Sequence, residues 1–115
     1  MMIDENNYKD FMSDTSMNCI HRRISEIKYL PDGLVSLYCD NNQLTSLPEL
    51  PDSLERLYCY DNQLTSLPEL PDGLVKLDCE DNQLPIEGAF YNKEDIKEFK
   101  IKLDNIIKLE EFLLP

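Results

Sequence analysis

Apolar residues recur along the chain with a fixed period of 20 residues. A first copy reads LVSLYCDNNQLTSLPELPD from Leu34, and a second reads LERLYCYDNQLTSLPELPD from Leu54. A third copy begins LVKLDCEDNQL at Leu74 and breaks off at Pro85. A period of this length is typical of proteins in which each repeat packs only against its neighbours. We therefore expect residues 34–84 to form three stacked repeats.

A degenerate repeat precedes these three, over residues 14–33. Its apolar positions are occupied by Met17, Cys19, Ile24, Ile27 and Leu30. Arg22 stands where the clear repeats have an asparagine. This segment should form a first, atypical strand of the same stack.

The start of each repeat predicts a short strand. Residues two apart on an extended chain face the same side, so Leu37 and Cys39 should face the core. Ser36, Tyr38 and Asp40, with their equivalents in later repeats, should then face solvent. Strands stacked in parallel would pair their backbone groups and enclose one continuous core.

The rest of each repeat predicts a turn and a non-helical return. Asn42, Asn62 and Asn82 follow the strands, and a buried asparagine can satisfy inward-turned backbone groups as both donor and acceptor. The Leu-Pro-Glu-Leu-Pro arm carries two prolines, so it cannot be an α-helix and should be extended or polyproline II. Pro-Asp-Gly or Pro-Asp-Ser then turns into the next strand.

The pattern LxxLxCxxNxLTSLPELPDG resembles the bacterial, effector-type subclass of leucine-rich repeats, which has the shortest unit of that superfamily. It is also similar to short repeat proteins of large DNA viruses, where cysteine is common at the third apolar position. The resemblance covers residues 14–84. It implies an α/β-type repeat solenoid with a parallel sheet on the concave face, a non-helical convex side, and recognition of a protein partner. Effectors of this type often carry a ubiquitin-ligase domain with a catalytic cysteine, but residues 85–115 contain no cysteine.

Both ends of such a stack need caps, because the end repeats would otherwise expose apolar faces. Residues 1–13 are predicted to be an N-terminal helical cap, with a short helix over 4–13 that begins at Asp4. Tyr8, Phe11 and Met12 would lie on one face of that helix.

Residues 85–115 are predicted to be a C-terminal helical cap. Asn92 followed by Asp95 resembles a capping box, and residues 93–113 contain neither glycine nor proline. An apolar stripe at helical spacing should cover Leu77, Cys79 and Leu84, and its members are Ile96, Phe99, Leu103, Ile106, Ile107 and Leu114.

Ile101, Leu109 and Phe112 lie on the opposite side of the same predicted helix. A helix that is apolar on two faces must bury both or expose one. One interpretation is that the helix ends near Leu109 and folds back. The other is that these three residues form a second contact surface, for a partner or for another copy of the chain.

Charge and composition narrow the class of partner and the location. The chain has 23 acidic and 11 basic side chains, a net charge of −12, which disfavours nucleic acid and anionic membranes. Residues 1–7 contain no basic region or apolar run, so no signal peptide is expected, and no stretch approaches the ~20 apolar residues of a transmembrane helix. We expect a cytoplasmic, intracellular protein with a polar or basic protein partner. Delivery into another cell by a non-classical route stays open.

The four cysteines are candidates for chemistry, because Cys19, Cys39, Cys59 and Cys79 should form a column one repeat apart. Neighbouring strands lie ~4.8 Å apart, so distance alone permits a disulfide between adjacent repeats. A linear column cannot surround a tetrahedral zinc ion. The favoured interpretation is reduced thiols acting as small apolar core residues.

Other features give no support for an enzyme. His21 is the single histidine and has no serine or cysteine placed beside it as a nucleophile. The three glycines, at positions 33, 73 and 88, do not form a phosphate-binding loop. The sequence therefore predicts a non-catalytic protein with no cofactor and no metal.

The candidate functional surface is the outward side of the strands, which is the concave face of the expected solenoid. Tyrosine and arginine often dominate binding energy at protein interfaces, and acidic residues flank them here. Residues 34–84 carry ten carboxylates against Arg56 and Lys76, a balance of −8. The predicted partner-binding residues are Tyr38, Asp40, Arg56, Tyr58, Tyr60, Lys76, Asp78 and Glu80.

Two functions remain in view for this surface. The first is a protein-interaction module, with a role directed at a host cell as one form of it. The second is a structural subunit of a larger assembly such as a virion, since three repeats offer little concave area. The tyrosines could also serve only as a ladder that stabilises the sheet.

Overall fold

The structure is a computed structural model that describes residues 1–114. Pro115, the last residue of the expected C-terminal cap, lies outside the described residues. The helices and strands are, in chain order, β1 (Met2–Ile3), η1 (Tyr8–Phe11), β2 (Met12–Ser13), β3 (Ser16–Asn18), β4 (Glu26–Ile27), β5 (Ser36–Tyr38), β6 (Arg56–Tyr58), β7 (Lys76–Asp78), β8 (Ala89–Phe90) and α1 (Lys93–Leu113).

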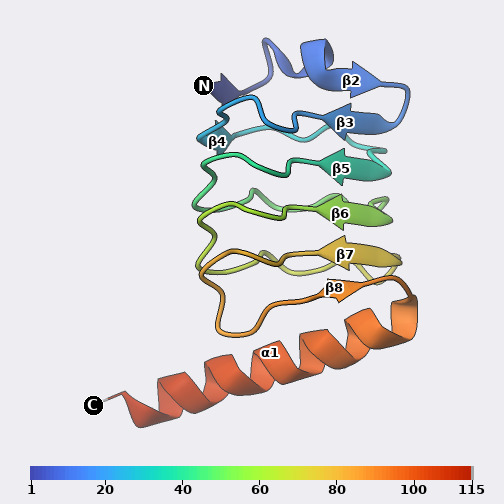
Figure 1. The fold of residues 1–115 in the computed structure, drawn as a ribbon. Helices are drawn as coiled ribbons and strands as arrows, with labels where there is room; N and C mark the ends of the chain where they lie inside the picture. The colour runs from blue at the N-terminus through green and yellow to red at the C-terminus, as the bar shows by residue number, and fades with distance from the viewer. Residues whose placement is uncertain (115) are drawn as a thin grey trace.

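A mixed six-stranded sheet runs the length of the molecule in the order β2-β3-β5-β6-β7-β8. The four central strands are parallel, and β2 and β8 are antiparallel at the two edges. Leu57 lies opposite Leu37 on one side and Leu77 on the other, so strand partners are 20 residues apart. The period of the sequence is therefore the register of the sheet, and Figure 1 shows the strands stacked one below another above α1.

The core lies behind the strands, between the sheet and the arms that return the chain to the next strand. The strand leucines and the cysteines that follow them are fully buried, as the alternation predicts. Leu44, Leu50 and their equivalents fill the core from the other side. Residues 46–51 and 66–71 are not helical, in agreement with their prolines.

The turn after each strand places one residue in the left-handed region of the backbone. Asn41, Asp61 and Asp81 have φ values of 57°, 56° and 54°. Asparagine and aspartate tolerate this conformation better than other residues with a side chain. His21, with φ 55°, occupies the same position in the degenerate repeat, which gives that histidine a structural place.

The asparagine that follows this turn satisfies buried backbone groups, as predicted, and these groups belong to two repeats. Asn62 Nδ2 donates to the carbonyl of Cys39 at 3.0 Å and to that of Cys59 at 3.2 Å. Its Oδ1 accepts from the backbone N–H of Leu44 at 3.0 Å. Asn42 and Asn82 make the equivalent bonds to their own repeat and to the one before.

Glu87 takes over this role where the repeats end. The Leu84 N–H donates to Glu87 Oε2 at 2.9 Å. In a longer stack, the side-chain oxygen of the next asparagine would accept this hydrogen bond. The carbonyl of Gly88 accepts from the Cys79 N–H at 3.0 Å, as Asp78 does for Cys59 one repeat earlier. The hairpin that leads into β8 therefore caps the last repeat with the same hydrogen bonds, and this cap was not predicted from the sequence.

The N-terminal cap differs from the predicted helix over residues 4–13, and that prediction is wrong. Only η1 is helical, with 3-10 geometry, and Asn7 rather than Asp4 precedes it. Asp4 Oδ1 accepts from the Asn6 N–H at 2.8 Å, a local turn that competes with helix formation. The chain on either side is drawn into sheets, because β1 pairs with β4 and β2 pairs with β3.

The C-terminal helix begins as predicted and ends later than one interpretation required. Asn92 Oδ1 accepts from the Asp95 N–H at 2.9 Å, which confirms the cap. Because α1 continues to Leu113, the predicted fold-back near Leu109 is wrong. Of the predicted apolar stripe, Ile96, Phe99 and Leu103 are buried, Ile106 is half-buried, and Ile107 and Leu114 are exposed.

We predict that Asn62→Ala lowers the free energy of unfolding by about 3 kcal/mol, because buried backbone groups of two repeats lose their partner. Urea denaturation measures this loss. The neighbouring Gln63→Ala is the control, since Gln63 is exposed, and it should change stability little. Equal effects of the two substitutions would contradict the bridging role of Asn62.

Candidate functional site

The candidate partner-binding residues lie on the outward face of β5, β6 and β7 and in the turns that follow. We call these eight residues the outer strip: Tyr38, Asp40, Arg56, Tyr58, Tyr60, Lys76, Asp78 and Glu80. Tyr60 and Glu80 are exposed, and the other six are half-buried. The register of the strands brings all of them onto one face, because Tyr38, Tyr58 and Asp78 are direct neighbours across the sheet.

Two tyrosines form the centre of the outer strip. The rings of Tyr38 and Tyr58 are stacked, with centroids 5.2 Å apart and an interplanar angle of 14°. Burial raises the pKa of Tyr58, and the nearby Tyr38 and Tyr91 raise it further, so the phenol stays protonated. The pair presents a rigid aromatic surface that carries two hydroxyl groups.

Asp40 is partly withdrawn from solvent at the edge of this pair. Its Oδ1 accepts from the Tyr60 N–H at 2.8 Å, which ties the turn after β5 to the turn after β6. Burial raises the pKa of Asp40, while the Tyr60 bond lowers it and the charge of Asp78 raises it. Asp40 is therefore partly engaged in holding the surface together.

The basic members of the outer strip have no carboxylate within ion-pair distance among residues 1–114. Arg56 Nη1 approaches Ser36 Oγ at 3.5 Å, and both Arg56 and Lys76 are half-buried. Ser36, predicted to face solvent, is only 3% exposed, so that prediction is wrong. The serine is short, and the arginine one strand away lies close against it.

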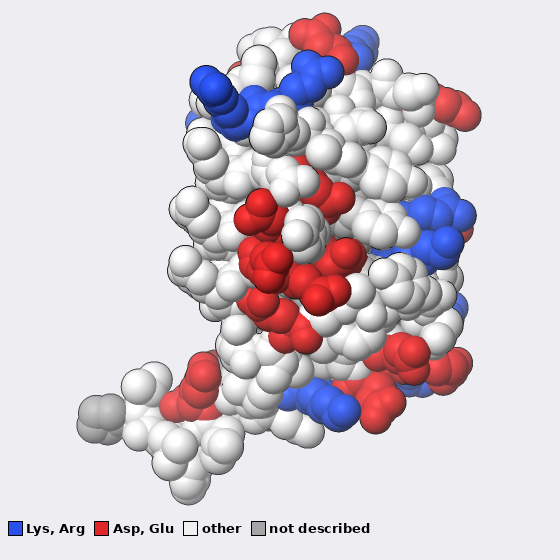
Figure 2. Space-filling view, viewed as in Figure 1, with Lys and Arg blue, Asp and Glu red and all other residues white. Residues whose placement is uncertain are grey.

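Acidic side chains gather beside the aromatic pair. Figure 2 shows Asp and Glu gathered on the face of the molecule that carries the strands, next to an uncharged area. The turns after β5, β6 and β7 supply Asp40, Asp61, Glu80 and Asp81. The negative charge of Asp81 is the main cause of the raised pKa of Tyr60. The surface combines aromatic contact area with a negative field.

The cysteine column is placed as predicted, inside the core. Cys19, Cys39, Cys59 and Cys79 are each 0% exposed and free. The thiols of Cys39 and Cys59 lie 3.4 Å and 3.5 Å from a backbone carbonyl of the following strand, and that of Cys79 lies 3.4 Å from the carbonyl of Gly88, just before β8. Burial raises the pKa of Cys19 to about 12 and that of Cys79 to about 11, and it raises the pKa values of Cys39 and Cys59 well above the usual range. Buried, protonated thiols are poor nucleophiles and poor metal ligands.

The other predicted contact surface is exposed on α1. Ile101, Leu109 and Phe112 are 55%, 57% and 83% exposed. Leu113 and Leu114 are also 70% and 71% exposed, so the C-terminal end of the helix is largely uncovered. Figure 1 shows this end of α1 extending beyond the stack of strands.

A groove between α1 and the last return arm was not found from the sequence. It is lined on the helix side by Lys93, Lys97 and Lys100 and on the arm side by Leu70 and Asp72. The spacing of the three lysines along the predicted helix was the one sign of this groove in the sequence. Only the structure shows that the arm runs beside them.

Comparisons with models of protein families, with curated proteins and with solved structures find no match to this chain. Within residues 1–114, no helix has both the length and the apolar character needed to cross a membrane. The same residues contain no group of three or more histidine, cysteine, aspartate or glutamate side chains that could hold a metal ion.

We predict that stability falls as the pH rises from 8 to 10. An unfolded thiol ionises near its ordinary pKa of 9.0, whereas the folded thiols resist ionisation. Each thiol should therefore contribute a loss of up to about 1.4 kcal/mol per pH unit above that value. Urea denaturation across this range measures the slope, which Cys79→Ala should reduce. A flat profile, or rapid alkylation of the native protein, would contradict the buried column.

Proposed function

We propose that this chain is a non-catalytic leucine-rich-repeat protein that binds another protein through the outer strip. The observation that carries the proposal is the stacked pair of Tyr38 and Tyr58 on an accessible sheet face, flanked by Arg56. Aromatic residues and arginine are enriched where protein interfaces bury most of their energy. The 20-residue register of the parallel strands supports the leucine-rich-repeat assignment.

The partner should present a polar or basic surface. Asp40, Asp78 and Glu80 belong to the outer strip, and the chain carries a net charge of −12. Complementary charge accelerates encounter and selects the partner, whereas the aromatic pair supplies contact area. The resemblance to effector-type repeats favours a partner in a host cell, and the proposed location is intracellular.

The tyrosine pair also has a structural explanation. Stacked rings across neighbouring strands stabilise a sheet by a few tenths of a kcal/mol to about 1 kcal/mol. A ladder with no other role would extend along the sheet, but Asp78 occupies the third position. The limited length of the aromatic row favours recognition over stabilisation.

A second candidate function is a structural subunit of a larger assembly. The exposed apolar end of α1, with Ile101, Leu109 and Phe112, favours it, because such patches commonly mark contact sites. In that case the contacts on several sides of the chain would add together.

We predict that Tyr58→Ala lowers the affinity for the partner at least about tenfold with little loss of stability. Immobilised wild-type protein and variants would be compared for proteins retained from cells of the native source, and retained proteins would then be purified and titrated. Gln63→Ala, outside the outer strip, is the control and should retain the same partner.

The proposal fails if Tyr58→Ala lowers the melting temperature and leaves retention intact, since the pair would then be a ladder. If the double variant Ile101→Glu and Phe112→Lys no longer retains the partner protein while Tyr58→Ala does, the assembly function is favoured. Circular dichroism of each variant separates a loss of binding from a loss of fold.

A further inference from the structure

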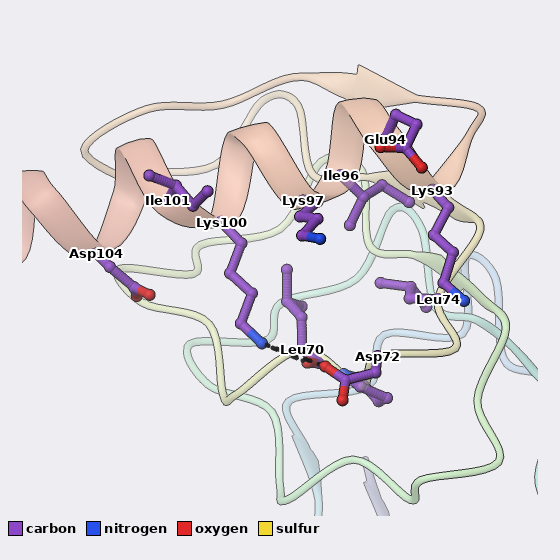
Figure 3. Close-up of a pocket in the computed structure, with 11 residues that line it drawn as sticks. Leu70, Asp72, Leu74, Lys93, Glu94, Ile96, Lys97, Lys100, Ile101 and Asp104 are labelled. Atoms are coloured by element: carbon purple, nitrogen blue, oxygen red, sulfur yellow. Dashed lines mark hydrogen bonds and ion pairs between the residues drawn. The ribbon is translucent and has the colours of Figure 1, made fainter.

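The groove beside α1 joins positive charge to an apolar floor. It has a volume of about 610 Å³, and its lining includes Leu70, Leu74 and Ile96 as well as the three lysines. Figure 3 shows Lys93, Lys97 and Lys100 directed from the helix toward the arm that carries Leu70 and Asp72. The three lysines lie on one side of the helix, and the lining also includes the carboxylates of Asp72, Glu94 and Asp104.

Two of these lysines are free to pair with a ligand. Lys100 Nζ donates to the Leu70 carbonyl at 3.1 Å and lies 4.0 Å from Asp72, so it is partly engaged. Lys93 and Lys97 are exposed and have no carboxylate within 4.0 Å in the described part of the chain.

The side of α1 that carries the three lysines becomes acidic and apolar toward the C-terminal end of the helix. Positions three or four apart lie along one side of a helix, and this line continues from Lys100 through Asp104, Ile107 and Glu111. Ile107 is 39% exposed, and Leu114 beyond it is 71% exposed. Neither Asp104 nor Glu111 has a basic group within 4.0 Å among residues 1–114. One side of the helix therefore carries lysines in its first half and carboxylates with apolar residues in its second half.

We propose that two copies of the chain associate through this side of α1, with the two helices antiparallel. A twofold axis near position 102 brings Lys93 opposite Glu111 of the second copy and Lys100 opposite Asp104 of the second copy. Ile107 of each copy then lies opposite Lys97 of the other and covers part of the apolar floor of that groove. Because the interface is isologous, every contact occurs twice.

The charge pattern favours a second copy over other occupants. An anionic lipid surface would meet the lysines but also the carboxylates of the same helix line and the negative charge of the whole chain. A second copy neutralises both halves at once. The helix has 21 residues and is therefore about 30 Å long, which gives an interface at the small end of the stable range and a dissociation constant in the micromolar range.

The experiment is a charge exchange measured by sedimentation equilibrium at low ionic strength. The wild-type chain should dimerise, and Lys93→Glu and Glu111→Lys should each weaken the dimer about tenfold or more, since each creates two repulsive contacts. The variant that carries both substitutions restores opposite charges and should recover wild-type affinity to within about threefold. Added salt should weaken the wild-type dimer.

Lys102→Glu is the matched control. Lys102 lies nine residues from Lys93, about half a turn round the helix, and its side chain is 66% exposed. The substitution Lys102→Glu makes the same change of charge on the same helix and should leave dimerisation unchanged.

Three results would overturn the proposal: a wild-type chain that stays monomeric at high micromolar concentration, single variants that behave like the control, or a double variant whose losses add. Circular dichroism of every variant confirms that the fold is retained. The groove and the outer strip share no residue, so failure of the dimer leaves the proposed partner-binding function intact.

Discussion

The asparagine that bridges consecutive repeats is the interaction on which the structure depends. The strands are only three residues long, so sheet hydrogen bonds alone tie each repeat weakly to the next. Asn42, Asn62 and Asn82 each add bonds to backbone groups of two repeats, at the point where the chain leaves the sheet and turns toward the core. These backbone groups are buried, and an unpaired buried carbonyl or N–H is costly. Leaving the asparagine out would therefore loosen both repeats at once.

This bridge fixes the spacing of everything else. Once residues 20 apart occupy equivalent places, a repeated residue becomes a column in space. The cysteines form a column in the core, the tyrosines form a pair on the surface, and each turn places one residue in the left-handed region of the backbone. The inward columns vary little because packing constrains them, whereas the outward positions change from Tyr38 to Tyr58 to Asp78. This freedom is what the proposed recognition of a partner by the outer strip would use.

The repeats could be predicted from the sequence because their features have a local cause or recur at a fixed period. The alternation of Leu57 and Cys59 and the cap of Asn92 follow from the chemistry of a few neighbouring residues. Asn62 bonds to groups 18 and 23 residues away, which the 20-residue period brings beside it. The ends could not, because their structure depends on contacts with distant segments. Residues near Tyr8 form only a 3-10 turn because their flanks pair with other strands. Glu87 replaces an asparagine only because the hairpin brings its carboxylate to Leu84, and no repeat in the sequence predicts that substitution.

The candidate surfaces divide in the same way. The outer strip follows from strand alternation. The burial of the neighbouring Ser36 does not, because it depends on the side chain of Arg56 in the next strand. For the second apolar side of α1, the sequence left two interpretations open, a fold-back near Leu109 and an exposed contact surface. Only the observed length of the helix decides between them. The groove needs both the helix and the arm at Leu70, which the sequence places 23 or more residues apart.

The side-chain amide protons of the asparagines report whether these side chains bridge stacked repeats. Nuclear magnetic resonance can follow the exchange of side-chain NH₂ protons with solvent. We expect slow exchange for Asn42 and Asn62, with contacts from each NH₂ group to protons of the preceding repeat, while the exposed Asn6 and Asn105 exchange freely. Equally fast exchange at all four residues, without contacts between repeats, would contradict this bridging.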